Sequence, residues 1–440
     1  MAFIHHQSCE CVKSELDIFA VPSTQTSIES GVWVEYNPIS ALTHGLPVEF
    51  NVLGGGQDYI DLANTMLYVR AQLIDANNQP IDNQAQVRPV NLLLHSLFSE
   101  VDFKLNDTLI SSSNNTYAYR AYLETLLSYG PAAKHSQLTS ALYYKDTAGH
   151  MEEANGNDAN CRNVGLRKRF AYLSEGKMVD MIGGIHCDIF LQERYLPSDV
   201  GFRLRFVRQK DAFCLMAPAG AANYKVKIVE CKLHVRKVKL SPSVFVAHAK
   251  ALEMGTAKYP LRRIVCKTFT VPQGNLNFTQ ENVFTGTLPT RLVIGMIDND
   301  SFNGSYVKNP FNFKHYSLTS LKLYLDGQAA HGIQPLELDF DAHQYINGYL
   351  TLFTGVGKIK KDEGNDITRE DYVGGYTLYV FDLSPDLCDS GHFQLSREGN
   401  VRLDVRFSVA LPQTINVIVY AEFESLLEID RDKNVLFDNS

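Results

Sequence analysis

The sequence predicts an all-β protein that folds two β-sandwich domains from one chain. Its 440 residues are too many for one ordinary domain and suit two of about 200. Hydrophobic residues make up 45% of the chain and charged residues 20%, which is a globular composition. Short stretches in which apolar and polar residues alternate recur between turn residues, and strands at this density indicate sandwiches or barrels.

Four stretches show this alternation most clearly, and two of them run into a tight turn. The stretches are 67–73, 101–105, 321–325 and 403–407. Asn106-Asp107 follows the second stretch, and Asp326-Gly327, a strong hairpin signal, follows the third. Residues 415–419 alternate in the same way and predict a further strand.

Helical spacing is rare, and one of its two instances is placed to be a linker. Residues 119–127 follow helical spacing, and Gly130-Pro131 ends the run. In the second instance Ser241 can cap a helix, Pro242 suits its first position, and Gly255 can end it. This second helix lies just past the middle of the chain, where a linker between two equal halves belongs.

The two halves also echo each other in sequence. A Tyr-Leu pair at 122–123 follows the first tight turn, and another at 349–350 follows the second, which favours a duplicated sandwich. We therefore predict five segments: an N-terminal arm at 1–24, a first sandwich at 25–240, a linker helix at 241–256, a second sandwich at 257–430 and a C-terminal tail at 431–440.

Charge and cysteine content narrow the class of protein. The formal net charge of −8 argues against a general nucleic-acid coat. No apolar run is long enough to cross a bilayer, and the N-terminal residues lack the apolar core of a secretory signal. We therefore expect all eight cysteines to be reduced thiols. They are residues 9, 11, 161, 187, 214, 231, 266 and 388.

Two groups near the N-terminus have the residue types of a ligand site. His5, His6, Cys9 and Cys11 could bind zinc, but structural zinc sites usually draw their ligands from two separated knuckles, so a flexible arm is favoured. The glycines at 54–56 could cradle a phosphate, but no Lys-Ser/Thr pair follows them, so a hairpin loop is favoured.

Two charged stretches could also bind a ligand. Glu337, Asp339 and Asp341 could hold a cation or serve a glycosidase, but a solvated strand face has the same pattern. The basic stretch 225–239 could face a genome or an acidic partner, although a solvated strand whose charges block edge pairing is favoured. Along this stretch the apolar residues move between even and odd positions, and such shifts predict β-bulges. No catalytic motif occurs, so we assign no catalytic, cofactor-binding or metal-binding residue and expect no cofactor and no enzyme activity.

Several segments resemble the major capsid protein of Polinton (Maverick) elements and the related adintoviruses. They are KSELDIF at 13–19, TQTSIE at 24–29, VEF at 48–50, YIDL at 59–62, YRAYLETLLSYG at 119–130, AHAKAL at 247–252, YP at 259–260 and NPFNF at 309–313 with the hairpin at 326–327. The resemblance implies a double jelly roll, with two antiparallel eight-stranded sandwiches and a few short helices.

The same resemblance implies a structural role in a virion. The chain would form homotrimers with a pseudo-hexagonal outline, which would build an icosahedral capsid inside the host nucleus or cytoplasm. Its partners would be other copies of itself, penton proteins and other minor capsid proteins, with no membrane span and no sequence-specific nucleic-acid binding. The resemblance supplies no catalytic residue.

Two other functions remain open on the same scaffold. A jelly-roll carbohydrate-binding protein or glycoside hydrolase needs an aromatic-lined concave face and a carboxylate pair, and the single Trp counts against it. A metal-dependent cupin-type enzyme needs converging histidines, but the 13 histidines are mostly scattered singly. A metal assay and a glycan array would separate both from a capsid protein.

Overall fold

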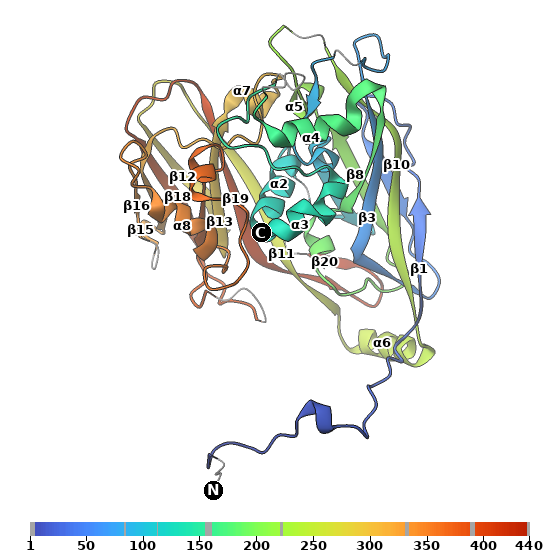
Figure 1. The fold of residues 1–440 in the computed structure, drawn as a ribbon. Coiled ribbons are helices and arrows are strands. Elements are labelled where there is room, and N and C mark those ends of the chain that lie inside the picture. The colour runs from blue at the N-terminus through green and yellow to red at the C-terminus, as the bar shows by residue number, and fades with distance from the viewer. Residues whose placement is uncertain are drawn as a thin grey trace.

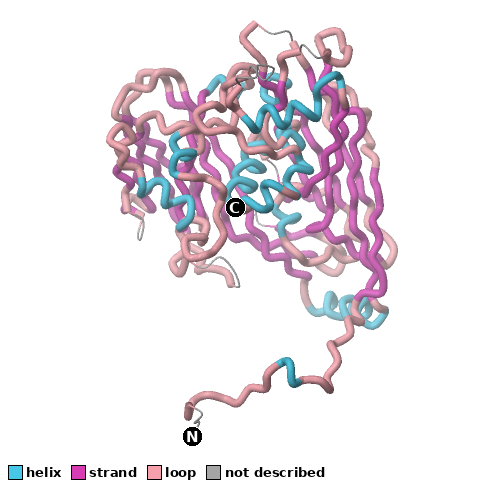
Figure 2. The backbone as a smooth tube through the Cα atoms, viewed as in Figure 1, coloured by secondary structure: helices cyan, strands magenta, loops and turns pink. Residues whose placement is uncertain are grey.

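The computed structural model describes residues 5–82, 85–111, 113–154, 161–220, 223–330, 334–387 and 392–437. Within these residues, long antiparallel strands form both sides of the molecule, and most of the helices gather between them (Figures 1 and 2). The all-β prediction with a few short helices is therefore confirmed.

The strands before residue 241 form two four-stranded sheets. The first has the order β1-β10-β3-β7 and the second β2-β8-β5-β6. Their bounds are β1 (Ile28–Tyr36), β2 (Val48–Val52), β3 (Asp58–Ile74), β5 (Phe98–Leu105), β6 (Thr108–Ser111), β7 (Met178–Gly184), β8 (Phe202–Arg208) and β10 (Lys225–Leu240). A separate short ladder joins β4 (Arg88–Pro89) to β9 (Leu215–Met216).

The strands after residue 256 repeat this arrangement. The order is β11-β19-β13-β17 in one sheet and β12-β18-β14-β15 in the other, with β20 added beside β19 and β16 beside β14. Their bounds are β11 (Ala257–Val271), β12 (Asn277–Thr287), β13 (Arg291–Asp298), β14 (Leu318–Leu325), β15 (Gln328–Ala329), β16 (Leu336–Glu337), β17 (Leu378–Asp382), β18 (Glu398–Phe407), β19 (Ile415–Ile429) and β20 (Val435–Phe437).

Each half of the chain is therefore a jelly roll. When the short strands β4, β9, β16 and β20 are left aside, each half has eight strands. In both halves, the first, eighth, third and sixth of these strands form one sheet, and the second, seventh, fourth and fifth form the other. This connectivity makes two sheets that face each other and bury their apolar faces together. The predicted double jelly roll is confirmed.

In both halves, helices occupy the connection between the third and fourth strands and that between the fifth and sixth strands. Those described are α1 (Leu93–Ser96), α2 (Tyr117–Ser128), α3 (Pro131–His135), α4 (Val164–Leu173), α5 (Asp211–Cys214), α6 (Pro242–Met254), α7 (Asn299–Asn303), α8 (Ile346–Thr354) and α9 (Arg369–Val373), with 3₁₀ turns η1 (Ser14–Leu16), η2 (Gln137–Ala141), η3 (Ser174–Gly176) and η4 (Asp188–Leu191). The Tyr-Leu echo lies in α2 and α8, which both stand between the fifth and sixth strands of their jelly roll. The echo thus marks two equivalent helices.

The helix α6 stands between the two sets of strands, as the linker prediction requires. Pro242 takes its first position and Gly255 follows its end, but the Ser241 side chain makes no capping bond to the helix backbone. None of its residues is buried. Tyr59 anchors it to β3, with a hydroxyl 3.1 Å from Nδ1 of His248. The domain boundaries stay a prediction, although β20 pairs with β19 and so places part of the predicted tail in a sheet.

Two local predictions are wrong because pairing is decided elsewhere in the chain. The glycines at 54–56 do not close a hairpin, since β2 and β3 belong to different sheets and the loop crosses from one to the other. The basic stretch is not an edge, because β10 lies between β1 and β3. The predicted bulges in β10 are present, as register shifts at 228/230 and 234/236 against β3.

Candidate functional site

The N-terminal ligand candidates do not form a binding site in the described residues. His5 and His6 lie side by side with ring centroids 4.8 Å apart, and Cys9 and Cys11 are exposed thiols. No group of three or more potential metal ligands comes together in the described ranges. The seven cysteines that the structure describes are free thiols, and Cys388 lies outside those ranges.

The three acidic residues of the second half do not share one strand. Only Glu337 lies in β16, and the backbone then turns, with the amide of Asp339 donating to the carbonyl of Gln344. Asp341 also lies in this turn. All three carboxylates are exposed, and Ser320 contacts that of Glu337 at 3.1 Å. Exposed, separated carboxylates do not resemble the paired acids of a glycosidase.

Three of the six Lys and Arg residues of β10 form ion pairs with carboxylates of the same sheet, and Arg236 does so with Asp61 at 3.5 Å. Lys232 lies 3.3 Å from Glu35 and 3.0 Å from Glu230, and Lys239 lies 3.1 Å from Glu29. The outer surface of this sheet is therefore a mosaic of both signs and does not form a simple anion-binding groove.

A contact surface between the two jelly rolls combines stacked aromatic rings with buried polar groups, and we call it the seam. On one side, α2 presents Tyr119 and Tyr122. On the other, Phe302 and Phe311 come from the segment after β13. Tyr122 stacks on Phe311 at 4.1 Å and 6°, and Tyr119 stacks on Phe302 at 5.6 Å and 12°. Such aromatic pairs stabilise a contact by about 0.5–1.5 kcal/mol beyond their buried area.

A buried ion cluster crosses the seam beside these rings. The Arg120 guanidinium lies 2.9 Å from Glu124 and 2.8 Å from Asp188. Asp188 also accepts the backbone N–H of Ile264 in β11, at 3.2 Å, so its carboxylate binds both jelly rolls. His186 lies 2.5 Å from the second oxygen of Glu124.

The pKa values in this cluster follow from burial and from the arginine. Burial acts to raise the pKa of Glu124, but Arg120 and His186 outweigh it and leave that pKa lowered. Burial raises the pKa of Asp188, against the opposing effect of Arg120. A glycosidase acid needs a carboxyl whose pKa is raised and that faces a second carboxylate across a substrate. Here both carboxylates face the same arginine, which is the arrangement of a structural ion pair.

Lysines complete the seam by capping the C-terminal end of α2. Lys134 Nζ donates to the carbonyl of Leu126 at 2.7 Å and to that of Asn365, in the second half, at 2.5 Å. Lys358 of the second half donates to the carbonyl of Ser128 at 2.7 Å. These bonds satisfy carbonyls that the helix itself leaves unpaired. Burial lowers the pKa of Lys134 to about 7.

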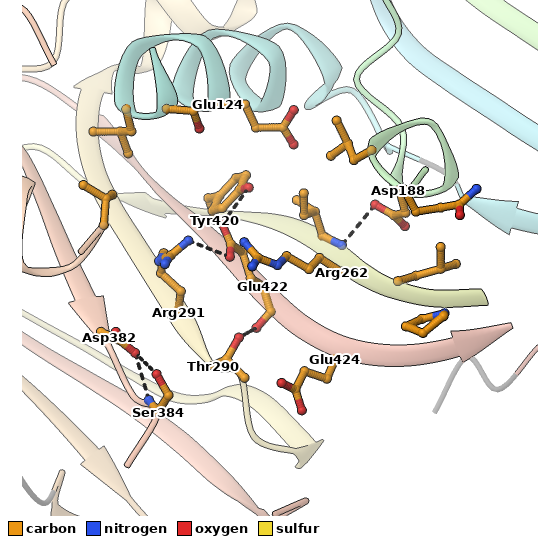
Figure 3. A pocket seen from close by; sticks show the side chains of 18 of the residues that line it. Glu124, Asp188, Arg262, Thr290, Arg291, Asp382, Ser384, Tyr420, Glu422 and Glu424 are labelled. Carbon is orange, nitrogen blue, oxygen red and sulfur yellow. Dashed lines mark hydrogen bonds and ion pairs between the residues drawn. The ribbon is translucent and has the colours of Figure 1, made fainter. Parts of the chain in front are cut away.

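A cavity of about 950 Å³ opens at the edge of the seam (Figure 3). Glu124 and Asp188 look into it from the first half, and β13 and β19 supply Arg291, Tyr420 and Glu422 from the second. Arg291 lies 2.9 Å from Glu422, and the Tyr420 hydroxyl donates to the same carboxylate at 3.1 Å. The hydroxyl of Ser384, which also lines the cavity, donates to the carboxylate of Asp382 (Figure 3). These polar side chains thus pair with one another.

The sequence predicted the helix α2 but not the buried ion pairs and ring contacts that this helix makes. Its helical spacing was visible, whereas the partners of Arg120 and Tyr122 lie 68 and 189 residues further along the chain. The local signal of an ion pair was Arg120 and Glu124, which stand four residues apart on an otherwise apolar helix.

The comparisons with known proteins agree on the fold. The match to a chain of the Sputnik virophage structure covers 99% of this chain and 94% of the virophage chain, at 10% identity and a TM-score of 0.67. The match to the capsid of the virus PBCV-1 covers 96% of this chain and 100% of the capsid chain, at 11% identity and a TM-score of 0.59. The match to the mavirus major capsid protein covers 100% of this chain and 97% of the mavirus chain, at 12% identity and a TM-score of 0.53. The second of these structures is a virus capsid, and the third is a viral major capsid protein.

Sequence comparison gives one full-length relative. An uncharacterized protein of Caenorhabditis elegans is 26% identical over 431 residues, which is 95% of this chain and 100% of the relative. No protein-family model matches the chain. None of the helices in the described ranges is long and apolar enough to cross a membrane.

Proposed function

We propose that this protein is a major capsid protein whose work is structural. One observation carries the proposal: two jelly rolls, held together by the seam, resemble viral capsid proteins over nearly the whole length of both chains. A subunit of this kind needs rigid faces for contact with its neighbours and no reaction centre. The pairing of polar groups in the cavity with one another fits that requirement.

In this proposal the protein forms homotrimers. Residues 25–240 and 257–430 are the two sandwiches, and three copies around an axis place six similar sandwiches in a ring with a pseudo-hexagonal outline. The rings tile an icosahedral shell in the virion together with penton and other minor capsid proteins. Assembly takes place inside the host cell, in the nucleus or the cytoplasm.

We also propose that the chain belongs to a Polinton (Maverick) or adintovirus element. The sequence segments that resemble this lineage are spread through both jelly rolls. The full-length relative in a nematode supports the same origin, because a mobile element integrated in an animal genome would leave such a protein there. The arm at 1–24 and the insertions at 147–162 and 217–224, of which residues 1–4, 155–160 and 221–222 lie outside the described ranges, are proposed to add contacts between subunits.

Sedimentation and negative-stain electron microscopy of the purified protein test the capsid proposal. We expect trimers at micromolar concentration and hexagonal particles, sheets or closed shells when the concentration is raised. Dilution should lower the apparent stability, because folding and association are linked. A well-folded monomer that forms none of these assemblies under any condition would refute the proposal.

A further inference from the structure

The cavity at the edge of the seam, which we call the seam cavity, has an apolar rim that is exposed to solvent. Tyr129 and Leu191 of the first half line it and are 41% and 54% exposed, and Phe393 of the second half lines it and is 50% exposed. Large side chains with this exposure that gather around one opening mark a contact site for another molecule. The volume of about 950 Å³ lies at the upper end of the range for binding pockets, so several side chains fit inside.

The N-terminal arm leaves its apolar side chains uncovered in a single copy. Every residue from 5 to 27 is exposed. Leu16, Ile18 and Phe19 are 70%, 75% and 93% exposed, in and just after the short turn η1. The arm leaves the body beside α6 and leads away from it (Figure 1), so the surface that covers these side chains belongs to another molecule.

The seam cavity and the root of the arm lie toward the same end of the molecule. The amide of Ser241, just before α6, donates to the carbonyl of Ser27 at 2.9 Å, so the arm begins beside α6. At its other end α6 leads into β11, and Pro260 of this strand lines the seam cavity. Phe19 stands nine residues before the start of β1, which gives it a reach of about 30 Å. Subunits that face the same way in a shell therefore bring the arm of each copy level with the seam cavity of the next.

The arm and the rim of the seam cavity also match in chemistry. The arm segment 15–19 reads Glu-Leu-Asp-Ile-Phe, in which two acidic side chains alternate with apolar ones. The segment 358–361 reads Lys-Ile-Lys-Lys; its isoleucine is 50% exposed, and Lys358 and Lys361 line the cavity. Acidic side chains beside apolar ones thus meet lysines beside an apolar rim. Opposite charge of this kind steers association and fixes the register of a contact.

We infer that the arm of one copy docks in the seam cavity of a neighbouring copy, with Leu16, Ile18 and Phe19 packed against the apolar rim. The inference rests on the proposed capsid function, because it needs neighbours held at fixed positions. Each copy supplies one arm and one seam cavity, so a repeated contact covers every arm and fills every cavity in an assembly. The docked arm also bridges the two jelly rolls of the copy that receives it, since both halves contribute to the rim.

Photo-cross-linking in assembled protein tests where the arm lies. Phe19 is replaced by photoreactive benzoylphenylalanine, and these copies are mixed before assembly with copies that carry a heavy isotope label. Mass spectrometry should find cross-links from residue 19 to peptides of the labelled copies that line the seam cavity, around Leu191 and Phe393. Cross-links to any other surface, or to the seam cavity of the same copy, would overturn the inference.

Protease cleavage of the arm in assemblies measures the same contact in variants. Phe19→Asp places a charge on the arm and Leu191→Asp places one on the rim, and each should speed cleavage at least about tenfold, as loss of a central apolar contact does. The matched controls are Ser23→Asp in the arm and Leu109→Asp on β6, where Leu109 is 43% exposed, and both should keep the wild-type rate.

Circular dichroism should show all four variants folded, because each replaced side chain is exposed. Loss of assembly in Phe19→Asp and Leu191→Asp but not in the controls would support the inference equally. Wild-type cleavage rates in both would sink it and leave the capsid proposal standing, whereas a wild-type protein that never associates would refute the capsid proposal itself.

Discussion

Replacing Arg120 by Met should destabilise the protein more than any surface charge substitution. The methionine keeps most of the apolar stem, so packing in α2 changes little. It removes the guanidinium that lies 2.9 Å from Glu124 and 2.8 Å from Asp188 in the seam. Two buried carboxylates then lose their arginine, with only His186 still beside Glu124, and Asp188 keeps its bond to the backbone of the second jelly roll.

The size of this effect follows from burial. Removing one partner of a buried ion pair costs about 3–5 kcal/mol, because the remaining charge stays desolvated. That is a large part of a total stability of about 5–15 kcal/mol. The matched control is Arg203→Met, since Arg203 forms an exposed pair with Asp107 at 3.2 Å. Exposed pairs contribute about 0–1 kcal/mol.

Urea denaturation at fixed protein concentration, followed by circular dichroism, measures both variants. A triple variant that adds Glu124→Gln and Asp188→Asn to Arg120→Met should recover most of the loss, because no unpaired charge remains in the seam. If Arg120→Met costs no more than Arg203→Met, the cluster does not hold the jelly rolls together and the reasoning is wrong.

Three further predictions use the same denaturation assay. Burial lowers the pKa of His95 well below its usual range, so below about pH 6.5 only the unfolded chain takes up the proton, and stability should fall by up to about 1.4 kcal/mol per pH unit. His95→Gln should remove this slope and the exposed His135→Gln should keep it. Burial lowers the pKa of Lys134 to about 7, so above pH 7 the unfolded chain keeps this proton while the folded chain loses it. The free energy of unfolding should therefore rise above pH 7 by up to about 1.4 kcal/mol per pH unit. Lys134→Met should lack this rise, and equal slopes in the variant and the wild-type protein would contradict the assignment. Gly295→Ala would place a Cβ 2.6 Å from the Phe313 ring in the seam and should cost about 1–3 kcal/mol, whereas Gly184→Ala meets no atom within 4 Å and should cost less than about 1 kcal/mol.

Local sequence determined the elements with strong periodicity. The alternating stretches at 67–73 and 101–105 lie in β3 and β5, and the helical stretch at 119–127 lies in α2. The Asp326-Gly327 turn has positive φ at both residues, 52° and 75°, as a tight two-residue hairpin requires. These features depend on neighbours in the chain, so the sequence alone was enough to place them.

Tertiary structure decided which strands pair and therefore which surfaces are free. The glycines at 54–56 join two sheets and β10 lies in the middle of its sheet, because pairing partners come from segments more than 100 residues away. The contacts of the seam also join segments that lie far apart in the sequence. Arg120 pairs with Glu124 in its own helix, but its second partner, Asp188, lies 68 residues further along the chain, and only the folded structure brings Asp188 and β11 onto α2.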